Sequence, residues 1–316
     1  QLAETLLLKQ QLLEGFQEYE WRPNQWRASQ GCQNQWHPSK NQQEPLVLVA
    51  EGTLGDTLLF SRYGPWLKGQ HGLDVRLSVQ LPLLKLLQQA LGDTLPVEPA
   101  NPHRPLREGS PGSVLPLPSA PAVFGTCQEH PALAKPHLKA DPPTVDHWRQ
   151  LLAIPPGEQL IGVNWHGSPL QALTERHQSD IPLELLAPLA ELKNTQLVSL
   201  QKGIGSEQLE SCPFRHRFIA SQEAVTGELR FEHTAALMSL CDWIVTDDSG
   251  PAHLAGCLGI PTIVLLAERS NWRWGHTGRQ TPWYPNTILL RQTASEGWQP
   301  LVAQARQIIE NQSKAL

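Results

Sequence analysis

The sequence predicts an α/β protein with two Rossmann-like, doubly wound domains that face a cleft. Short continuous apolar runs alternate with segments of helical spacing, which is typical of parallel sheets covered by helices on both faces. The alternation occurs twice, before and after a stretch rich in proline and glycine at 101–143. Ligands of such sheets bind beyond the carboxyl ends of the strands, and clefts between domains are frequent sites. We therefore expect the functional residues in the loops that follow strands.

Three segments follow from these patterns. Residues 1–43 are predicted to form a helix over 2–20 and then a polar, tryptophan-bearing connector, and residues 44–143 and 144–316 form the two domains. In the first domain, apolar runs predict strands at 45–51, 74–80 and 95–100, helices at 54–70 and 81–91, and then loops and short strands that end in a linker. In the second domain they predict strands at 159–165, 195–201, 214–220, 243–247, 261–266 and 287–292, with helices at 145–153, 181–192, 231–241, 250–258 and 298–312.

Charge and composition exclude several classes of partner. The chain has 316 residues, with 25 basic and 30 acidic side chains and a net charge of −5, and no basic block suggests nucleic acid. Five scattered cysteines without a C-x-x-C pair argue against a disulfide framework or a zinc site and favour a reducing, cytoplasmic compartment. No apolar run reaches the ~18 residues of a membrane span. The start has no signal-peptide features, and the opening Gln1 suggests a piece of something longer.

The first turn with chemical potential is AEGTLGDT, residues 50–57. Gly52 and Gly55 lie between a buried strand and a helix, where glycine permits positive φ or close approach of a ligand. Asp56 falls in the first turn of that helix, where the helix dipole favours an ionised carboxylate that could take a proton from a hydroxyl. The alternative is that Asp56 only caps the helix. Glu51 is a second choice for the base.

The second such turn is VTDDSGPAHLAGCLGIP, residues 245–261. Asp248 or Ser249 is suited to cap the helix that follows, and Pro251 suits a first-turn position that needs no N–H donor. The free N–H groups of such a helix N-terminus bind anions, and a diphosphate is the anion that we expect there. His253 in the first turn could add a donor to phosphate. The plainer interpretation is that His253 only hydrogen-bonds within the protein at the start of the helix. For the Asp247–Asp248 pair, it is that one aspartate caps the helix and the other is solvated.

Several nucleotide-dependent and hydrolytic classes lack their motifs in this chain. The sequence has no G-x-G-x-x-G after the first strand, no G-x-x-x-x-G-K-[ST], no H-E-x-x-H and no G-x-S-x-G. It also has no Asp-x-Asp, the pattern with which metal-dependent sugar transferases hold a divalent ion. A helix N-terminus can replace that metal, because it too offsets charge on a leaving group.

In these two turns and in several other segments, the chain resembles glycosyltransferase family 9, the heptosyltransferase-like enzymes of GT-B fold. It is most similar to bacterial relatives in which this domain follows tetratricopeptide repeats. The order and spacing of several segments carry the resemblance: LLLKQQLLEGFQEYEWR, LVLVAEGTLGDTLLFSRYGPWL, LPLPSAPAVFGT, IGVNWHGSP, IPLELLAPL, LVSLQKG, VTDDSGPAHLAGCLGIPTIVLL, SNWRWG and TPWYPN. The resemblance implies that residues 1–43 are the helical remnant of a repeat array and its connector.

The resemblance also implies an activity: transfer of a sugar from a nucleotide diphosphate to a hydroxyl, with inversion and without a required metal or cofactor. Asp56 matches the proposed catalytic base, and Gly52, Thr53 and Gly55 form the turn on the acceptor side. The remaining matches imply contacts with the donor: Trp165, Gly167, Ser168, Gln201, Lys202, Asp248, Ser249, Gly250 and His253.

One departure from the family concerns the basic residue that relatives usually carry directly before Ile-Pro-Leu. Ser179 and Asp180 stand there in this chain, and Arg176 or Lys202 would have to substitute. An aromatic group, Trp272, Trp274, Trp283 and Tyr284, is interpreted as packing of the second domain. Arg215, His216 and Arg217 are expected to be partly exposed along a strand.

Three functions remain open at this point. The first is the glycosyltransferase, with a protein, peptide or glycan acceptor. The second is a scaffold of the same shape without catalysis, which the missing basic residue and the repeat-like start favour. The third is a nucleotide-sugar epimerase of the same fold.

Overall fold

The computed structural model describes residues 1–23, 44–100, 113–167, 180–293 and 297–313. The chain divides into two compact units, residues 1–139 and residues 140–316. Each unit is described by itself.

The first unit contains a four-stranded parallel sheet in the order β3-β2-β1-β4. Its strands are β1 (Leu46–Val49), β2 (Val75–Val79), β3 (Val97–Pro99) and β4 (Ser113–Pro116). Leu46 pairs with Val75 on one side and with Ser113 on the other, so β1 lies centrally and is buried along its whole length. Since β2 and β4 flank β1 on opposite sides, the strand order reverses at β1 and β4, the place where open α/β sheets bind ligands.

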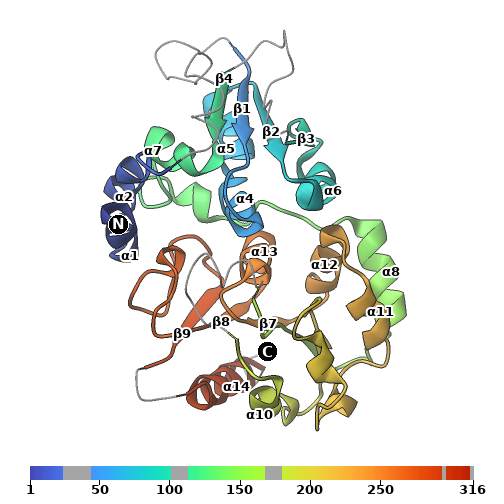
Figure 1. Ribbon diagram of the computed structural model, residues 1–316. Coiled ribbons are helices and arrows are strands. Elements are labelled where there is room, and N and C mark those ends of the chain that lie inside the picture. The colour runs from blue at the N-terminus through green and yellow to red at the C-terminus, as the bar shows by residue number, and fades with distance from the viewer. Residues whose placement is uncertain (24–43, 101–112, 168–179, 294–296, 314–316) are drawn as a thin grey trace. The chain divides into compact units, whose positions relative to one another are not determined.

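Helices α4 (Leu54–Phe60), α5 (Tyr63–His71) and α6 (Leu81–Leu91) connect these strands, and α5 packs on β2 and α6 on β3. After β4 come the 3-10 turn η2 (Leu117–Ser119), helix α7 (Ala120–Phe124) and the 3-10 turn η3 (Pro131–Ala134). The chain begins with α1 (Leu2–Leu8) and α2 (Leu12–Tyr19), which lie beside α7 in Figure 1.

The second unit contains a five-stranded parallel sheet in the order β6-β5-β7-β8-β9. The strands are β5 (Gln159–Val163), β6 (Thr195–Ser199), β7 (Trp243–Thr246), β8 (Thr262–Leu266) and β9 (Thr287–Arg291). The chain first moves outward from β5 to β6 and then returns to pair β7 on the other side of β5. The topological switch point of this sheet therefore lies between β5 and β7.

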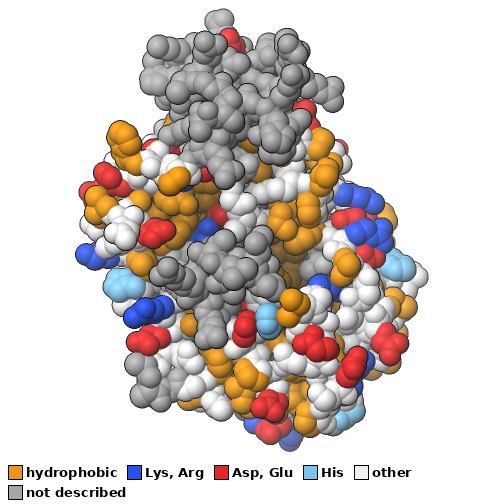
Figure 2. All heavy atoms as spheres, in the orientation of Figure 1, with side chains coloured by type: hydrophobic (Ala, Val, Ile, Leu, Met, Phe, Trp, Pro, Cys, Tyr) orange, Lys and Arg blue, Asp and Glu red, His pale blue; other side chains and the backbone are white. Residues whose placement is uncertain are grey.

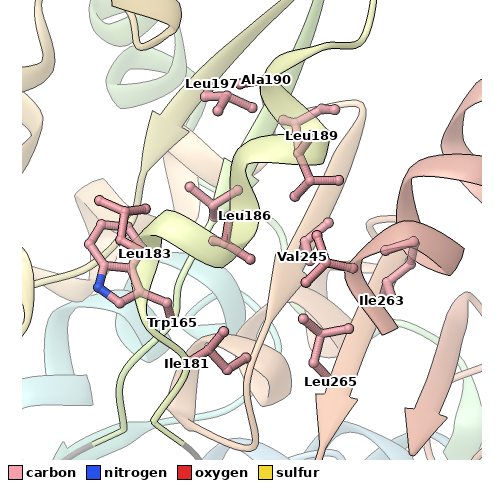
Figure 3. Packing of buried hydrophobic residues seen from close by; sticks show 14 of the residues in the cluster. Trp165, Ile181, Leu183, Leu186, Leu189, Ala190, Leu197, Val245, Ile263 and Leu265 are labelled. Carbon is pink, nitrogen blue, oxygen red and sulfur yellow. The ribbon is translucent and has the colours of Figure 1, made fainter. Parts of the chain in front are cut away.

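Figure 1 shows helices on both sides of this second sheet. On one side lie α10 (Ala187–Ala190) with the preceding 3-10 turn η4 (Leu183–Leu186), and α14 (Gln299–Ser313). On the other lie α12 (Phe231–Met238) and α13 (Gly250–Leu258), with α8 (Pro142–Leu152) against α12; α11 (Gln222–Gly227) packs on β6. Figure 3 shows Trp165 packed with Ile181, Leu183 and Leu186 in the hydrophobic core under η4.

Several predicted elements differ from the structure. The helix predicted over 181–192 consists of the 3-10 turn η4 and the short helix α10. The helix predicted over 2–20 is two helices, because Gln10 between them adopts left-handed backbone with φ 59°. The helix predicted over 54–70 breaks after α4, since Pro65 has no N–H and its ring would clash with the Ser61 carbonyl in a continuous helix.

The strand predicted over 214–220 is also wrong. Residues Arg215–Arg217 form a 3-10 turn, η6, and Phe218 makes a single bridge to Leu197. Phe214 and Phe218 are both buried and their rings stack with centroids 6.1 Å apart. A spacing of four residues places two side chains on one face both in a strand and in a helical turn, so the spacing alone did not distinguish them. His216 between them is exposed, as expected for this stretch.

No helix within the described ranges is both long and apolar enough to cross a bilayer. On the face shown in Figure 2, basic and acidic side chains are intermixed rather than gathered in one patch.

Candidate functional site

The turn after β1 is closed by a reciprocal capping box. Thr53 is the N-cap of α4, and its hydroxyl accepts a hydrogen bond from the Asp56 amide at 3.2 Å. The Asp56 carboxylate accepts in return from the Thr53 amide at 2.9 Å and from the Thr53 hydroxyl at 2.8 Å. Gly52 has φ +84°, and a Cβ there would lie 2.6 Å from Asp56 Oδ2. Glycine at 52 is therefore required both by its backbone and by the approach of this carboxylate.

This geometry is compatible with both interpretations of Asp56, as a helix cap and as a base. The side chain is a cap, as the plainer interpretation held, and it is only 5% exposed. It is also a carboxylate fixed at the carboxyl edge of the sheet, in the first turn of a helix that favours its ionised form. Gly55 beside it is buried within α4. Catalysis by Asp56 stays a prediction.

In the second unit, a buried polar network joins the two loops at the switch point. Asn164 follows β5 and donates from Nδ2 to Asp247 Oδ1 at 2.8 Å and to Ser249 Oγ at 3.2 Å. The Ser249 hydroxyl donates to the same Asp247 oxygen at 2.5 Å. The sequence did not single out Asn164, since one asparagine after a strand carries no distinctive signal. The structure shows that it fixes the loop that begins α13.

Asp247 is fully buried, and burial raises the pKa of its carboxyl from 3.8 to about 6. Hydrogen bonds from Ser249 and Asn164 oppose this shift, because they stabilise the charged form. Asp248 is also buried, and it accepts a hydrogen bond from the Trp274 indole at 2.5 Å. The expectation that one of these two aspartates is solvated is therefore wrong.

The N-terminus of α13 has an unusual cap. Ser249 occupies the N-cap position with extended backbone, but its side chain makes no capping hydrogen bond. The hydroxyl turns instead to Asp247, so the expectation that it caps α13 is wrong. A Cβ added to Gly250 would meet no described atom within 4 Å. Pro251 has no N–H and the Ala252 amide donates to the Ser249 carbonyl at 3.0 Å, so the Gly250 amide is the backbone group that this turn offers to a ligand, at a place with open space.

His253 is held against aromatic rings. Its ring is stacked on Trp274 with centroids 5.1 Å apart, and its Nδ1 lies 2.9 Å from the Tyr284 hydroxyl. Trp272, Trp274, Trp283 and Tyr284 are all buried, which confirms that this aromatic group packs the second unit. The Tyr284 hydroxyl therefore occupies Nδ1, one of the two ring nitrogens of His253.

Gly256 of α13 provides a stability prediction. A Cβ at this position would lie 2.4 Å from two carbons of the Tyr284 ring. Gly256→Ala is therefore expected to lower the free energy of unfolding by about 1–3 kcal/mol through overpacking, and chemical denaturation measures it. Gly250→Ala on the same helix is the matched control, since its methyl group meets open space. Equal stability of the two variants would contradict the close packing of α13 on Tyr284.

Two residues predicted to contact the donor support the loop after β5. Gln201 accepts hydrogen bonds from the amides of Trp165 and His166 and donates to the carbonyls of His166 and Ile204, at 2.9–3.2 Å. These four bonds use both donors and both acceptor positions of its amide. Trp165 is fully buried and donates from its indole to the Gly205 carbonyl at 3.2 Å. These contacts position the loop after β5, and contact of Trp165 and Gln201 with the donor stays a prediction.

Lys202 and Gly167 lie near the same strand ends. The Lys202 ammonium donates to the Val225 carbonyl in α11, and burial lowers the pKa of Lys202 to about 8. Gly167 is half-buried, and its carbonyl lies 2.7 Å from Nδ1 of His166, whose Nε2 is 3.5 Å from Asp180. Sequence reasoning missed His166. Ser168 and Arg176 lie outside the described residues.

Metal ligands were not predicted from the sequence. In the parts of the chain that the structure describes, no group of three or more His, Cys, Asp and Glu side chains could hold a metal ion.

Comparison with solved structures defines the class of fold. The E. coli ADP-heptose LPS heptosyltransferase II is 14% identical with a TM-score of 0.56, over 86% of this chain and all of that one. A glycosyltransferase family 9 protein from Veillonella parvula DSM 2008 is 15% identical with a TM-score of 0.53, over 79% of this chain and 86% of that one. The E. coli heptosyltransferase WaaC with ADP-2-deoxy-2-fluoro heptose is 14% identical with a TM-score of 0.50, over 85% and 99%. The fold is therefore GT-B, as expected.

The sequence of the second unit indicates the class of enzyme more narrowly than the fold does. Residues 205–300 match the family model described as glycosyltransferase family 9 (heptosyltransferase). The matched range contains the β7–α13 turn with Asp247, Ser249 and Gly250. No protein of curated function matches the chain significantly. The family match and the fold together support glycosyltransferase activity.

Proposed function

We propose that this chain is an inverting, metal-independent glycosyltransferase that moves a sugar from a nucleotide diphosphate to a hydroxyl of a protein, peptide or glycan. The second unit binds the donor diphosphate at the N-terminus of α13. Asp56 of the first unit is the base that accepts the proton of the attacking hydroxyl. The enzyme works in the cytoplasm, and the helices at its start derive from a repeat array.

The observation that carries this proposal is the orientation of Ser249. The hydroxyl of an N-cap serine normally accepts a hydrogen bond from a free amide of its own helix, whereas here the hydroxyl donates to the buried Asp247. The Ser249 and Ala252 amides donate to the Asp247 and Ser249 carbonyls and Pro251 has no N–H, so the Gly250 amide is the group of this turn that a ligand would meet. The helix dipole adds partial positive charge there. The family match spans this turn.

The chemistry follows from these groups. The acceptor oxygen attacks the anomeric carbon on the face opposite the diphosphate, so the configuration inverts. Its proton passes to the Asp56 carboxylate, while the bond between the anomeric carbon and the diphosphate oxygen breaks. The nucleoside diphosphate leaves with the bonding electron pair, and the Gly250 amide together with the α13 helix dipole stabilises the growing negative charge. Removing one such preorganised donor typically costs about 3–4 kcal/mol of transition-state stabilisation.

A thermal-shift screen with ADP, UDP and GDP tests donor binding, and ADP is the first probe because one structural neighbour carries an ADP-heptose analogue. A specific binder present at 100 times its Kd stabilises the folded state by about 2.7 kcal/mol. We expect one nucleoside diphosphate to raise Tm clearly above the others.

Gly250→Ala locates the binding site. Its methyl group points toward the helix N-terminus, where the diphosphate is proposed to lie. We expect the nucleotide Kd to rise about tenfold, which is about 1.4 kcal/mol, at unchanged thermal stability of the free protein. Full affinity in this variant would place the diphosphate elsewhere.

A scaffold without catalysis is the second candidate, and Asp180 favours it. This acidic residue stands directly before Ile181, near the place where the resemblance implies a basic one, and lies 3.5 Å from His166. Titration calorimetry without saturable heat for any nucleotide or nucleotide sugar would support the scaffold. A changed sugar configuration after incubation of the donor alone, observed by NMR, would support an epimerase.

A further inference from the structure

Arg22, directly after the α1–α2 pair, reaches the carboxyl edge of the first sheet. Its Nε and Nη2 donate to the two carboxylate oxygens of Glu51 at 2.7 and 3.0 Å, and Nη2 also donates to the Ser119 hydroxyl at 2.9 Å. Nη1 donates to the Tyr19 carbonyl at 3.0 Å and to Glu20 at 2.9 Å. The side chain is 9% exposed, and its guanidinium lies over the Tyr19 ring.

These contacts join the two loops of the switch point in the first sheet. Glu51 follows β1 and lies two residues before Thr53 of the capping box, whereas Ser119 ends η2, which follows β4. A bidentate arginine–carboxylate pair fixes geometry as well as charge. Arg22 therefore holds the backbone from which the Thr53–Asp56 box begins.

Arg22 has no donor left for a substrate. A guanidinium has five N–H groups, and the five hydrogen bonds above use all of them. The residue thus differs from an arginine that binds a substrate phosphate or carboxylate, which must keep donors available. Its role is exerted through Glu51 and Ser119.

The helical pair is also docked without Arg22. Phe16 is fully buried, and its ring meets Phe60 of α4 edge-on with centroids 5.7 Å apart. Leu7 and Leu12 are buried, and Gln128 donates to the Gln10 carbonyl at 3.0 Å. Replacement of Arg22 should therefore release the loops while α1 and α2 stay in place.

We propose that Arg22 is a positioning residue for the sugar-transfer reaction, so that the N-terminal helical segment forms part of the first unit's functional edge. Through Glu51 and Ser119 it fixes the turn that carries Asp56. This inference rests on the proposed function, and its test separates the two.

The test compares Arg22→Gln with Glu20→Gln, which removes one negative charge beside Arg22 and leaves the contacts to Glu51 and Ser119. Hydrogen–deuterium exchange, which needs no activity, should accelerate about tenfold in peptides covering 51–57 and 117–119 for Arg22→Gln, through local opening, and stay unchanged for Glu20→Gln. Unchanged exchange at 51–57 in Arg22→Gln would overturn the proposal.

The kinetic part uses release of nucleoside diphosphate from ADP-, UDP- or GDP-sugars. We expect Arg22→Gln to lower kcat about 10–100-fold, as for a misplaced catalytic group, with the Kd of the nucleoside diphosphate and Tm near the wild-type values. Arg22→Lys should recover part of the loss, and Glu20→Gln should stay within about threefold, as for a partly exposed pair. A normal kcat despite faster exchange would overturn the positioning role. If the wild type turns over no nucleotide sugar, the proposed function fails and the positioning role with it, whereas exchange still shows whether Arg22 holds the turn.

Discussion

Asp56→Asn is expected to abolish sugar transfer, with a loss in kcat of about 10²–10⁴-fold, the usual contribution of a general base. Asparagine keeps an oxygen that accepts from the Thr53 amide, so the capping box and the turn should survive. Nucleoside diphosphate binding should be unchanged, because the proposed donor site lies in the second unit. Steady-state kinetics together with titration calorimetry check both statements.

Thr53→Val is the control that separates cap from base. It removes the hydroxyl that accepts from the Asp56 amide and donates to its carboxylate, but it leaves the carboxylate itself. Loss of an N-cap costs about 0.5–2 kcal/mol of stability, so Tm should fall while kcat stays within about tenfold of wild type, well short of a lost base. If Asp56→Asn turns over normally, the assignment of the base is wrong. If Thr53→Val loses as much activity as Asp56→Asn, the box geometry and not the proton transfer is essential.

The second large effect concerns the buried network around Asp247. Asn164→Ala removes a hydrogen bond to a buried carboxylate and is expected to lower the free energy of unfolding by about 1.5–3 kcal/mol at pH 8. The same variant should weaken nucleoside diphosphate binding, because Asn164 also contacts Ser249 at the start of α13. Urea denaturation at several pH values measures the first effect.

The pH dependence follows from the raised pKa of Asp247. The folded protein holds this proton up to about pH 6, whereas the unfolded chain releases it near 3.8. The stability that this group contributes therefore falls as pH rises from about 4 to 6 and is constant above. Without Asn164 the charged form loses a donor, so the folded pKa rises further and stability keeps falling above pH 6. The difference between wild type and Asn164→Ala should accordingly be small at pH 5 and largest at pH 8.

Asp247→Asn supplies the control for this series. The three hydrogen bonds to Oδ1, from Asn164, Thr246 and Ser249, remain possible with a neutral amide. In the Asp247→Asn background, the cost of Asn164→Ala should no longer depend on pH. A cost that varies equally in both backgrounds would assign the titration to another group.

The strands of both sheets were largely predictable because their signal is local. β1 and β8 are largely continuous apolar runs, as is typical of buried parallel strands. The glycine turn at 52–56 and the helix start at Pro251 are predictable because glycine and proline restrict or permit particular backbone conformations. The wrong strand at 214–220 has the same origin, since Phe214 and Phe218 satisfy two periodicities and only the bridge to Leu197 and the 3-10 turn show which one applies.

By itself the sequence determined the two doubly wound sheets and the two turns, because apolar period, glycine and proline act on neighbouring residues. Only the tertiary structure decided what each polar side chain does. Arg22 donates hydrogen bonds to partners 29 and 97 residues away, and Gln201 bonds to the loop 35 residues before it. The Ser249 hydroxyl donates to Asp247 and does not cap its own helix. Hydrogen-bonding capacity is finite, and its use depends on which distant groups the folded sheet brings within 3 Å, which no local pattern records.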